Sequence, residues 1–179
     1  GRAGNVIGGG DWAKDRIVVD CVKAWSENKL VEIRNPLATR PWQHVLEPLS
    51  GYLILGQFLF NDKKFHGEAF NFGPSADQNF TVQDLLIDLS KYWGVRNQSK
   101  AFNLTDDKPF HEAGLLKLNC DKALFYLKWE STLVYDETID FVGDWYASYY
   151  RENKGMYNLT LEQVKKYEML ASTRKKAWT

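Results

Sequence analysis

Gly4-Asn5-Val6-Ile7-Gly8-Gly9-Gly10-Asp11-Trp12 is the most informative stretch of the chain. Three glycines directly after a short apolar run are typical of a strand that ends in a loop with wide backbone freedom. In such a loop, backbone N–H groups can approach an anion, and Arg16, at the start of the next predicted helix, adds positive charge. A plain flexible loop is the alternative interpretation. Because a natural domain rarely begins with its most constrained loop, we expect the chain to be the later part of a larger protein.

Outward from this loop, apolar periodicity alternates between helices and short strands, which predicts an α/β fold. The predicted helices cover 15–28, 49–60, 81–93, 121–127 and 136–150, followed by a polar helix that starts near residue 160. Capping-box patterns at Thr81–Asp84 and Thr160–Gln163 indicate two of the helix starts. The predicted strands are Leu30–Arg34, Ala69–Phe72 and Leu116–Asn119. In helix 49–60, the residues that recur at helical spacing are Leu49, Leu53, Gly56 and Phe60.

Length and composition favour one globular domain from a reducing compartment. The 179 residues fit the usual size of a single domain, and 23 basic residues balance 23 acidic ones, unlike the basic domains that bind nucleic acid. Cys21 and Cys120 are too few for a disulfide framework. No apolar run approaches the roughly 20 residues of a membrane-spanning helix, and no secretory signal is present. We therefore expect a cytoplasmic protein without a nucleic-acid or membrane partner.

A second candidate site is the stretch Arg34-Asn-Pro-Leu-Ala-Thr-Arg40-Pro-Trp-Gln-His44-Val-Leu-Glu-Pro48. Its two arginines flank a proline-containing turn, and a planar guanidinium can donate paired hydrogen bonds to a phosphate. The alternative is a surface arginine paired with Glu47, with the tryptophan in the core.

A third candidate is Phe110-His111-Glu112-Ala113, where a carboxylate could accept hydrogen bonds from both hydroxyls of a ribose. The alternative is a solvent-exposed loop. No metal site is expected, because His44, His66 and His111 lack ligand spacing and the two cysteines do not form a Cys-x-x-Cys pair. Arrangements for a serine or cysteine nucleophile also lack a supporting local motif.

Two long motifs and three shorter segments match one known family. The long motifs are Arg2-Ala-Gly-Asn-Val-Ile-Gly-Gly-Gly-Asp-Trp12 and Arg34-Asn-Pro-x-Ala-Thr-Arg-Pro-Trp-Gln-His-Val-Leu-Glu-Pro-Leu49. The shorter segments are Phe70–Pro74, His111–Ala113 and Leu118–Ala123. Together they resemble the C-terminal half of the CDP-glucose 4,6-dehydratases, nucleotide-sugar enzymes of the extended short-chain dehydrogenase/reductase family. The similarity runs from Gly1 to about Tyr150, and it does not place the tail beyond Gly155.

The resemblance implies a particular fold and reaction. Residues 1–155 would form the substrate-binding part plus the last strands and helices of a Rossmann-type NAD-binding fold, whose N-terminal half is missing, and residues 156–179 a polar C-terminal helix or tail. Such enzymes use tightly held NAD to oxidise the sugar at C4, eliminate water across C5 and C6, and return the hydride to C6. CDP-glucose would give CDP-4-dehydro-6-deoxy-glucose, a precursor of deoxy sugars in bacterial surface polysaccharides. The full-length parent would be a homodimer.

Carried over by position, the resemblance also implies substrate-binding residues. These are Asn5, Arg16, Arg40, His44, His111 and Glu112. Asn5 and Arg16 would reach the diphosphate or the sugar, Arg40 would lie near the nucleotide phosphates, and His44 beside the nucleotide. His111 and Glu112 stand where relatives carry an arginine-containing loop, which fits a branch-specific nucleotide contact.

The largest departure from the family concerns catalysis and the cofactor. The glycine-rich dinucleotide fingerprint and the Thr-Asp-Glu set are absent from the sequence, and no tyrosine has a lysine four residues later in the family's context. Oxidation at C4 needs a base of depressed pKa, and the elimination needs an acid and a base. We therefore expect no catalytic residue in this chain, no activity from it alone, and NAD held mainly by the missing half. A smaller departure is Val19, where the pattern usually has proline.

Two alternatives stay open. The parent could be another NAD-dependent nucleotide-sugar epimerase or dehydratase, or the chain could be a complete, non-catalytic nucleotide-binding module. A complete module predicts a well-packed first strand, whereas a partial fold predicts exposed apolar surface where the sheet should continue.

Overall fold

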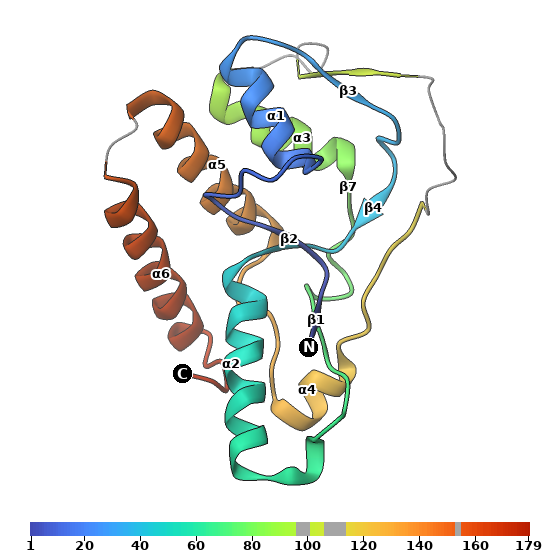
Figure 1. Ribbon diagram of the computed structural model, residues 1–179, viewed down its shortest axis with the longest axis vertical. Helices are drawn as coiled ribbons and strands as arrows, with labels where there is room; N and C mark the ends of the chain where they lie inside the picture. Colours follow the sequence, from blue (N-terminus) through green and yellow to red (C-terminus); the bar gives the residue numbers. More distant parts are fainter. Residues whose placement is uncertain (96–100, 106–113, 153–154) are drawn as a thin grey trace.

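The computed structural model describes residues 1–95, 101–105, 114–152 and 155–179 (Figure 1). Its helices are α1 (Ile17–Ser26), α2 (Leu46–Asn61), α3 (Val82–Ser90), α4 (Asp121–Leu127), α5 (Tyr135–Glu152) and α6 (Met156–Thr173), with short 3-10 helices η1 (Lys63–Phe65) and η2 (Lys91–Trp93). Its strands are β1 (Arg2–Ala3), β2 (Asn5–Ile7), β3 (Val31–Ile33), β4 (Thr39–Arg40), β5 (Trp42–His44), β6 (Asn71–Phe72), β7 (Phe80–Thr81) and β8 (Phe102–Leu104). Helices and strands alternate along the chain, so the predicted α/β fold is confirmed.

The described strands form four separate pairs. β1 pairs with β6, β2 with β5, and β3 with β8, all in parallel, whereas β4 and β7 are antiparallel. A parallel pair needs a crossover connection, and α1 lies in the one that joins β2 to β5. In this pair Asn5 lies opposite Trp42 and Ile7 opposite His44. The register therefore fixes the point at which the glycine-rich loop leaves β2, beside the start of α2.

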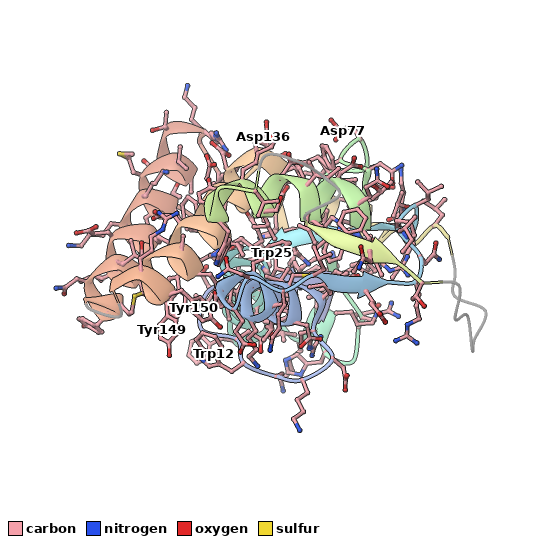
Figure 2. All side chains as sticks on the ribbon, turned by 90° about the horizontal axis from the view of Figure 1, so that it is seen from above. Trp12, Trp25, Asp77, Asp136, Tyr149 and Tyr150 are labelled. Carbon is pink, nitrogen blue, oxygen red and sulfur yellow. The ribbon has the colours of Figure 1, made fainter. Side chains whose placement is uncertain are left out.

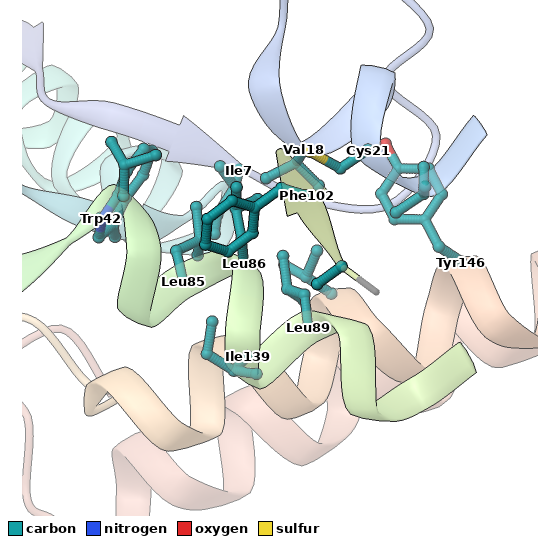
Figure 3. Packing of buried hydrophobic residues seen from close by; sticks show 14 of the residues in the cluster. Ile7, Val18, Cys21, Trp42, Leu85, Leu86, Leu89, Phe102, Ile139 and Tyr146 are labelled. Atoms are coloured by element: carbon teal, nitrogen blue, oxygen red, sulfur yellow. The ribbon is translucent and has the colours of Figure 1, made fainter. Parts of the chain in front are cut away.

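Three hydrophobic clusters hold these elements together. The largest one lies between α1, α3 and α5, in the upper part of Figure 1, and Figure 3 shows its packing. Its most deeply buried members include Cys21, Val22, Leu85, Leu86, Leu89 and Val142. A second cluster lies below it, where α2 and α4 pack around Phe70, Phe72, Leu127 and Trp129. Helix α6 runs along α5 and closes a third cluster through Tyr167 and Phe141.

Several elements form where the sequence predicts them. Helix α3 begins with the expected capping box: Thr81 Oγ1 accepts from the Asp84 N–H at 3.0 Å, and Asp84 Oδ2 accepts from the Thr81 N–H at 2.8 Å. Helix α4 has the predicted bounds, and α1 and α5 differ from their predicted ranges by a few residues at the ends. These helices are amphipathic, so their periodicity is read directly from the sequence.

Two predicted elements differ from the structure. Leu116–Asn119 is not a strand; the nearest pairing is a single bridge between Thr39 and Leu115. The predicted helix start at Thr160 is also wrong, because α6 begins at Met156 after Gly155 in the left-handed region. The Thr160 hydroxyl donates to the Met156 carbonyl at 2.8 Å, and Gln163 Nε2 donates to the Phe141 carbonyl at 2.8 Å. Both side chains therefore serve helix packing rather than capping.

Helix α2 is apolar on both faces. It begins at Leu46, before the predicted start, because Pro48 is tolerated in the first turn. Its buried face includes Ser50, Ile54 and Leu55, whereas Leu53 and Phe60, from the periodic set, are 77% and 91% exposed. The chain thus has an exposed apolar surface on α2. Within the described ranges, no helix combines the length and apolar character needed to cross a membrane.

Glu47 is the centre of a buried polar network that joins α2 to α6. Its carboxylate accepts from the N–H groups of Thr132 and Leu133, at 2.9 Å and 2.6 Å, and from the Tyr167 hydroxyl at 3.1 Å. Burial raises the pKa of this carboxyl group, and the hydrogen bonds from Leu133 and Thr132 oppose that shift. Glu47 therefore has a structural role as a buried hydrogen-bond acceptor.

Candidate functional site

The best candidate site is a cleft of about 780 Å³ that opens beside β2, which we call the Asn5 cleft. Strand β2, the loop that follows it, the first turn of α1, the β4–β5 segment and residues 116–118 surround it. The polar side chains in its lining belong to Asn5, Asp11, Asp15, Arg16 and Arg40, and its larger apolar ones include Val18, Trp42, Leu116, Leu118 and Tyr146. A cleft of this size can hold most of a nucleotide-sized ligand.

Three of the predicted site residues meet in this cleft. Asn5 comes from β2, Arg40 from β4, and Arg16 precedes the first residue of α1. They lie up to 35 residues apart in the sequence, and the β2–β5 pair brings them together because it places Asn5 opposite Trp42. Arg16 stands at the N-cap position of α1, where the helix dipole and free N–H groups favour an anion. The arrangement therefore brings an asparagine and two arginines to the lining of one cleft.

Arg40 is largely withdrawn from solvent. Its side chain is 9% exposed, and Nη1 donates to the Thr39 carbonyl at 2.9 Å. It also borders a small neighbouring cavity lined by Ser75, Gln78 and Asn79. A shielded guanidinium binds a phosphate more strongly than an exposed one, since less solvent screens the charge.

The glycine loop is packed rather than loose. A Cβ on Gly9 would lie 2.1 Å from the ring of Trp145, and one on Gly8 would lie 2.8 Å from a methyl group of Val45. Of the three consecutive glycines, only Gly10 has a positive φ, of 80°. Space, more than backbone freedom, therefore requires glycine at two of these positions, and the alternative of a plain flexible loop does not hold.

Asp11 and Asp15 were missed as cleft residues by the sequence reasoning. Both line the Asn5 cleft beside Arg16, so its rim carries negative as well as positive charge. Carboxylates repel phosphate but accept hydrogen bonds from sugar hydroxyls. The cleft is thus suited to a ligand with an anionic part and a hydroxyl-rich part.

Tyr146, from α5, is a third cleft residue that no sequence motif indicated. Its ring reaches α1 beside Cys21 (Figure 3), and its hydroxyl donates to the Asp11 carbonyl at 2.8 Å. Burial raises the pKa of this hydroxyl, so the phenol stays protonated at neutral pH. Tyr150 and Lys154 do stand four residues apart, but Tyr150 packs against Trp12 and Trp93, and Lys154 lies outside the described residues.

The structure does not bring His44 to the cleft. Its ring is 3% exposed and packs edge-on against Phe141, with 5.3 Å between the ring centroids. Nδ1 accepts from the Leu46 N–H at 3.4 Å, and burial lowers the pKa of His44 to about 4. His44 is therefore a buried, neutral side chain outside the lining of the Asn5 cleft, and its assignment to substrate binding stays a prediction. His111 and Glu112 lie outside the described residues.

A second hollow, of about 350 Å³, lies between α3 and α5 but does not suit an anion. Asp88, Asp136 and Asp140 line it together with Lys91 and Tyr92. The three carboxylates would repel a phosphate. We therefore take the Asn5 cleft as the candidate site.

The described residues do not provide a place for the pyrophosphate of NAD at the glycine loop. A dinucleotide fold needs bare glycines that open directly into a helix, so that the phosphates can approach the helix N-terminus. Here Trp145 covers Gly9, and α1 begins only at Ile17. Among the residues that the structure covers, no group of three or more His, Cys, Asp or Glu side chains could hold a metal ion.

Comparison with known proteins gives one close relative in sequence. The chain is 39% identical over 173 residues to a CDP-glucose 4,6-dehydratase of Salmonella typhimurium, which covers 97% of this chain. It spans 47% of that relative, or about half its length. The resemblance seen in the sequence is thereby confirmed. No family model matches the chain.

Solved structures with the same fold include both epimerases and dehydratases. The UDP-glucuronic acid 4-epimerase of Bacillus cereus, solved with UDP-glucuronic acid and NAD, matches 82% of this chain with a TM-score of 0.66 and 20% identity. The dTDP-glucose 4,6-dehydratase of Bacillus anthracis, solved with NAD, matches 85% with a TM-score of 0.67 and 17% identity. In each case the chain covers 44% of the solved protein. These likenesses show that the chain has the fold of part of these solved proteins.

Proposed function

We propose that this chain, a relative of CDP-glucose 4,6-dehydratase, forms the substrate-binding part of an NAD-dependent nucleotide-sugar dehydratase. In this proposal the Asn5 cleft binds CDP-glucose through its diphosphate. Arg16 and Arg40 pair with the phosphates, Asn5 donates its amide to the diphosphate or the sugar, and Asp11 and Asp15 face the sugar hydroxyls.

One observation carries the proposal: Asn5, Arg16 and Arg40, chosen from sequence motifs, line the same cleft. A nucleoside diphosphate carries several phosphate oxygens, and charge-assisted hydrogen bonds to them contribute about 1.5–3 kcal/mol each. The two guanidinium groups would supply such bonds, and they balance the formal charge of the two carboxylates on the rim. The 39% identity to a CDP-glucose 4,6-dehydratase supports cytidine as the nucleoside.

Calorimetric titration with CDP and CDP-glucose tests this proposal. Arg40→Ala is expected to weaken the binding of both ligands by about ten- to a hundredfold, as the loss of one charge-assisted pair implies. Arg34→Ala is the matched control, since Arg34 belongs to the same motif but is exposed and does not line the cleft. Equal binding by wild type and Arg40→Ala would contradict the proposal.

For the whole enzyme, the proposal extends to conversion of CDP-glucose into CDP-4-dehydro-6-deoxy-glucose, with NAD held mainly by residues outside this chain. The chain alone is then expected to release no water from CDP-glucose, and the whole enzyme is expected to be a homodimer. Absorbance of the dehydro sugar in alkali measures the first point, and light scattering of the whole enzyme measures the second.

An epimerase is the second candidate, because solved epimerases share the fold with TM-scores similar to that of the dehydratase. The two differ in the product of the complete enzyme. An epimerase would return a sugar that keeps its oxygen at C6, and a dehydratase would not. Mass analysis of the product separates them by the 18 Da of one water molecule.

A further inference from the structure

The loop between β2 and α1 is held against α5 by aromatic packing. Trp12 contacts the rings of Trp145, Tyr146, Tyr149 and Tyr150, with centroids 4.7–6.2 Å apart, and Figure 2 shows Trp12 grouped with Tyr149 and Tyr150. Tyr146 adds the hydrogen bond to the Asp11 carbonyl. This loop carries Asp11, Asp15 and Arg16 to the rim of the Asn5 cleft.

Trp145, on α5, packs against the glycines of the loop. Its ring fills the space that a side chain at Gly9 would need. The indole Nε1 donates to Thr160 Oγ1, on α6, at 2.9 Å, and the same hydroxyl donates to the Met156 carbonyl. The Thr160 hydroxyl thus accepts one hydrogen bond and donates another, which links the indole over Gly9 to the backbone of α6.

We propose that Thr160 and Trp145 are positioning residues, through which the C-terminal helix α6 sets the conformation of the loop that bears Asp11 and Arg16. Neither residue lines the Asn5 cleft, so any effect on a ligand passes through the loop. The contact chain runs from Thr160 to Trp145, from Trp145 to Gly9, and along the backbone to the rim. For its effect on affinity this inference rests on the proposed function of the cleft.

Thr160→Val tests the inference, because valine keeps the shape of threonine and removes the acceptor. Thr160→Ser restores a hydroxyl. Thr173→Val is the matched control: Thr173 also lies on α6 and also donates to a carbonyl four residues earlier, that of Met169. Two quantities are measured on the same chain, namely amide hydrogen exchange of residues 8–16 and the affinity for CDP.

We expect Thr160→Val to raise amide exchange in residues 8–16 and to weaken CDP binding by up to about fivefold, because the loss of one hydrogen bond sets that upper limit. Thr160→Ser and Thr173→Val should resemble wild type in both measurements. Unchanged exchange in Thr160→Val, or faster exchange with unchanged CDP affinity, would overturn this inference alone. If wild type did not bind CDP, the proposed function of the cleft would be overturned instead. The exchange data would still test whether α6 sets the conformation of the loop.

Discussion

Replacing Glu47 with leucine is expected to destabilise the chain by about 4 kcal/mol. Leucine fills a similar volume but leaves the buried N–H groups of Thr132 and Leu133 without their acceptor. An unsatisfied buried donor costs about 1–3 kcal/mol, so two of them give about 4 kcal/mol. Tyr167 adds little to this sum, because its hydroxyl can donate to Ser50 Oγ at 3.1 Å instead.

A glutamine at position 47 should cost about half as much. Its amide retains one accepting oxygen, and it removes the buried charge whose desolvation raises the pKa of Glu47. The control is Glu68→Gln, because Glu68 is an exposed carboxylate that pairs with Lys122 at 2.6 Å on the surface. Little change is expected there, since surface ion pairs are weak.

Equilibrium unfolding in urea, followed by tryptophan fluorescence, gives these differences directly. The order of stability should be wild type, then Glu47→Gln, then Glu47→Leu, with Glu68→Gln close to wild type. If Glu47→Leu unfolded within 1 kcal/mol of wild type, the Glu47 carboxylate would not be the acceptor that joins α2 to the segment before α5.

Three further changes have expected outcomes. The pKa of His44 is lowered to about 4 in the folded chain, so between pH 6.5 and 4 only the unfolded state protonates this side chain. About 3 kcal/mol of stability that is present above pH 6.5 is therefore lost as the pH falls to 4. In urea titrations over this pH range, His44→Gln should lose less stability than wild type. Gly9→Ala should lower the free energy of unfolding by about 1–3 kcal/mol, because its Cβ meets the ring of Trp145, and thermal melting measures this. The double variant Leu53→Glu/Phe60→Glu should bind less of a hydrophobic fluorescent dye than wild type, since both side chains are exposed on α2. Dye binding equal to that of wild type would show that α2 is not the surface that binds the dye.

Much of the helical structure was predictable because it depends on local signals. The Thr81–Asp84 capping box and the amphipathic period of α5 are complete within a few residues, so the sequence contains all the information that they need. Leu116–Asn119 has strand-like composition, but a strand also needs a partner, and the pairing that the described residues show there is a single bridge between Thr39 and Leu115. The sequence of α2 does not indicate which face of the helix is buried, because both faces are apolar.

The site was predictable only in part, for a similar reason. Asn5, Arg16 and Arg40 stand in motifs whose chemistry suggests an anion, and strand pairing brings them together. His44 stands in the same motif, but it is buried and its ring packs against Phe141 of α5, a contact that no local pattern indicates. The loop after β2 packs against α5, and this packing brings three further residues to the cleft: Asp11, Asp15 and Tyr146. No local sequence pattern indicates this packing.

The most direct test of a diphosphate site in the Asn5 cleft is a residue-by-residue map of CDP binding from ¹H–¹⁵N spectra of the chain. We predict that CDP shifts the amide signals of Asn5, Gly8, Arg16 and Arg40, and that cytidine without phosphates shifts them much less. Signals from the α3–α5 hollow around Asp140 should stay in place. Shifts confined to that hollow, or equal shifts with cytidine and CDP, would contradict the account.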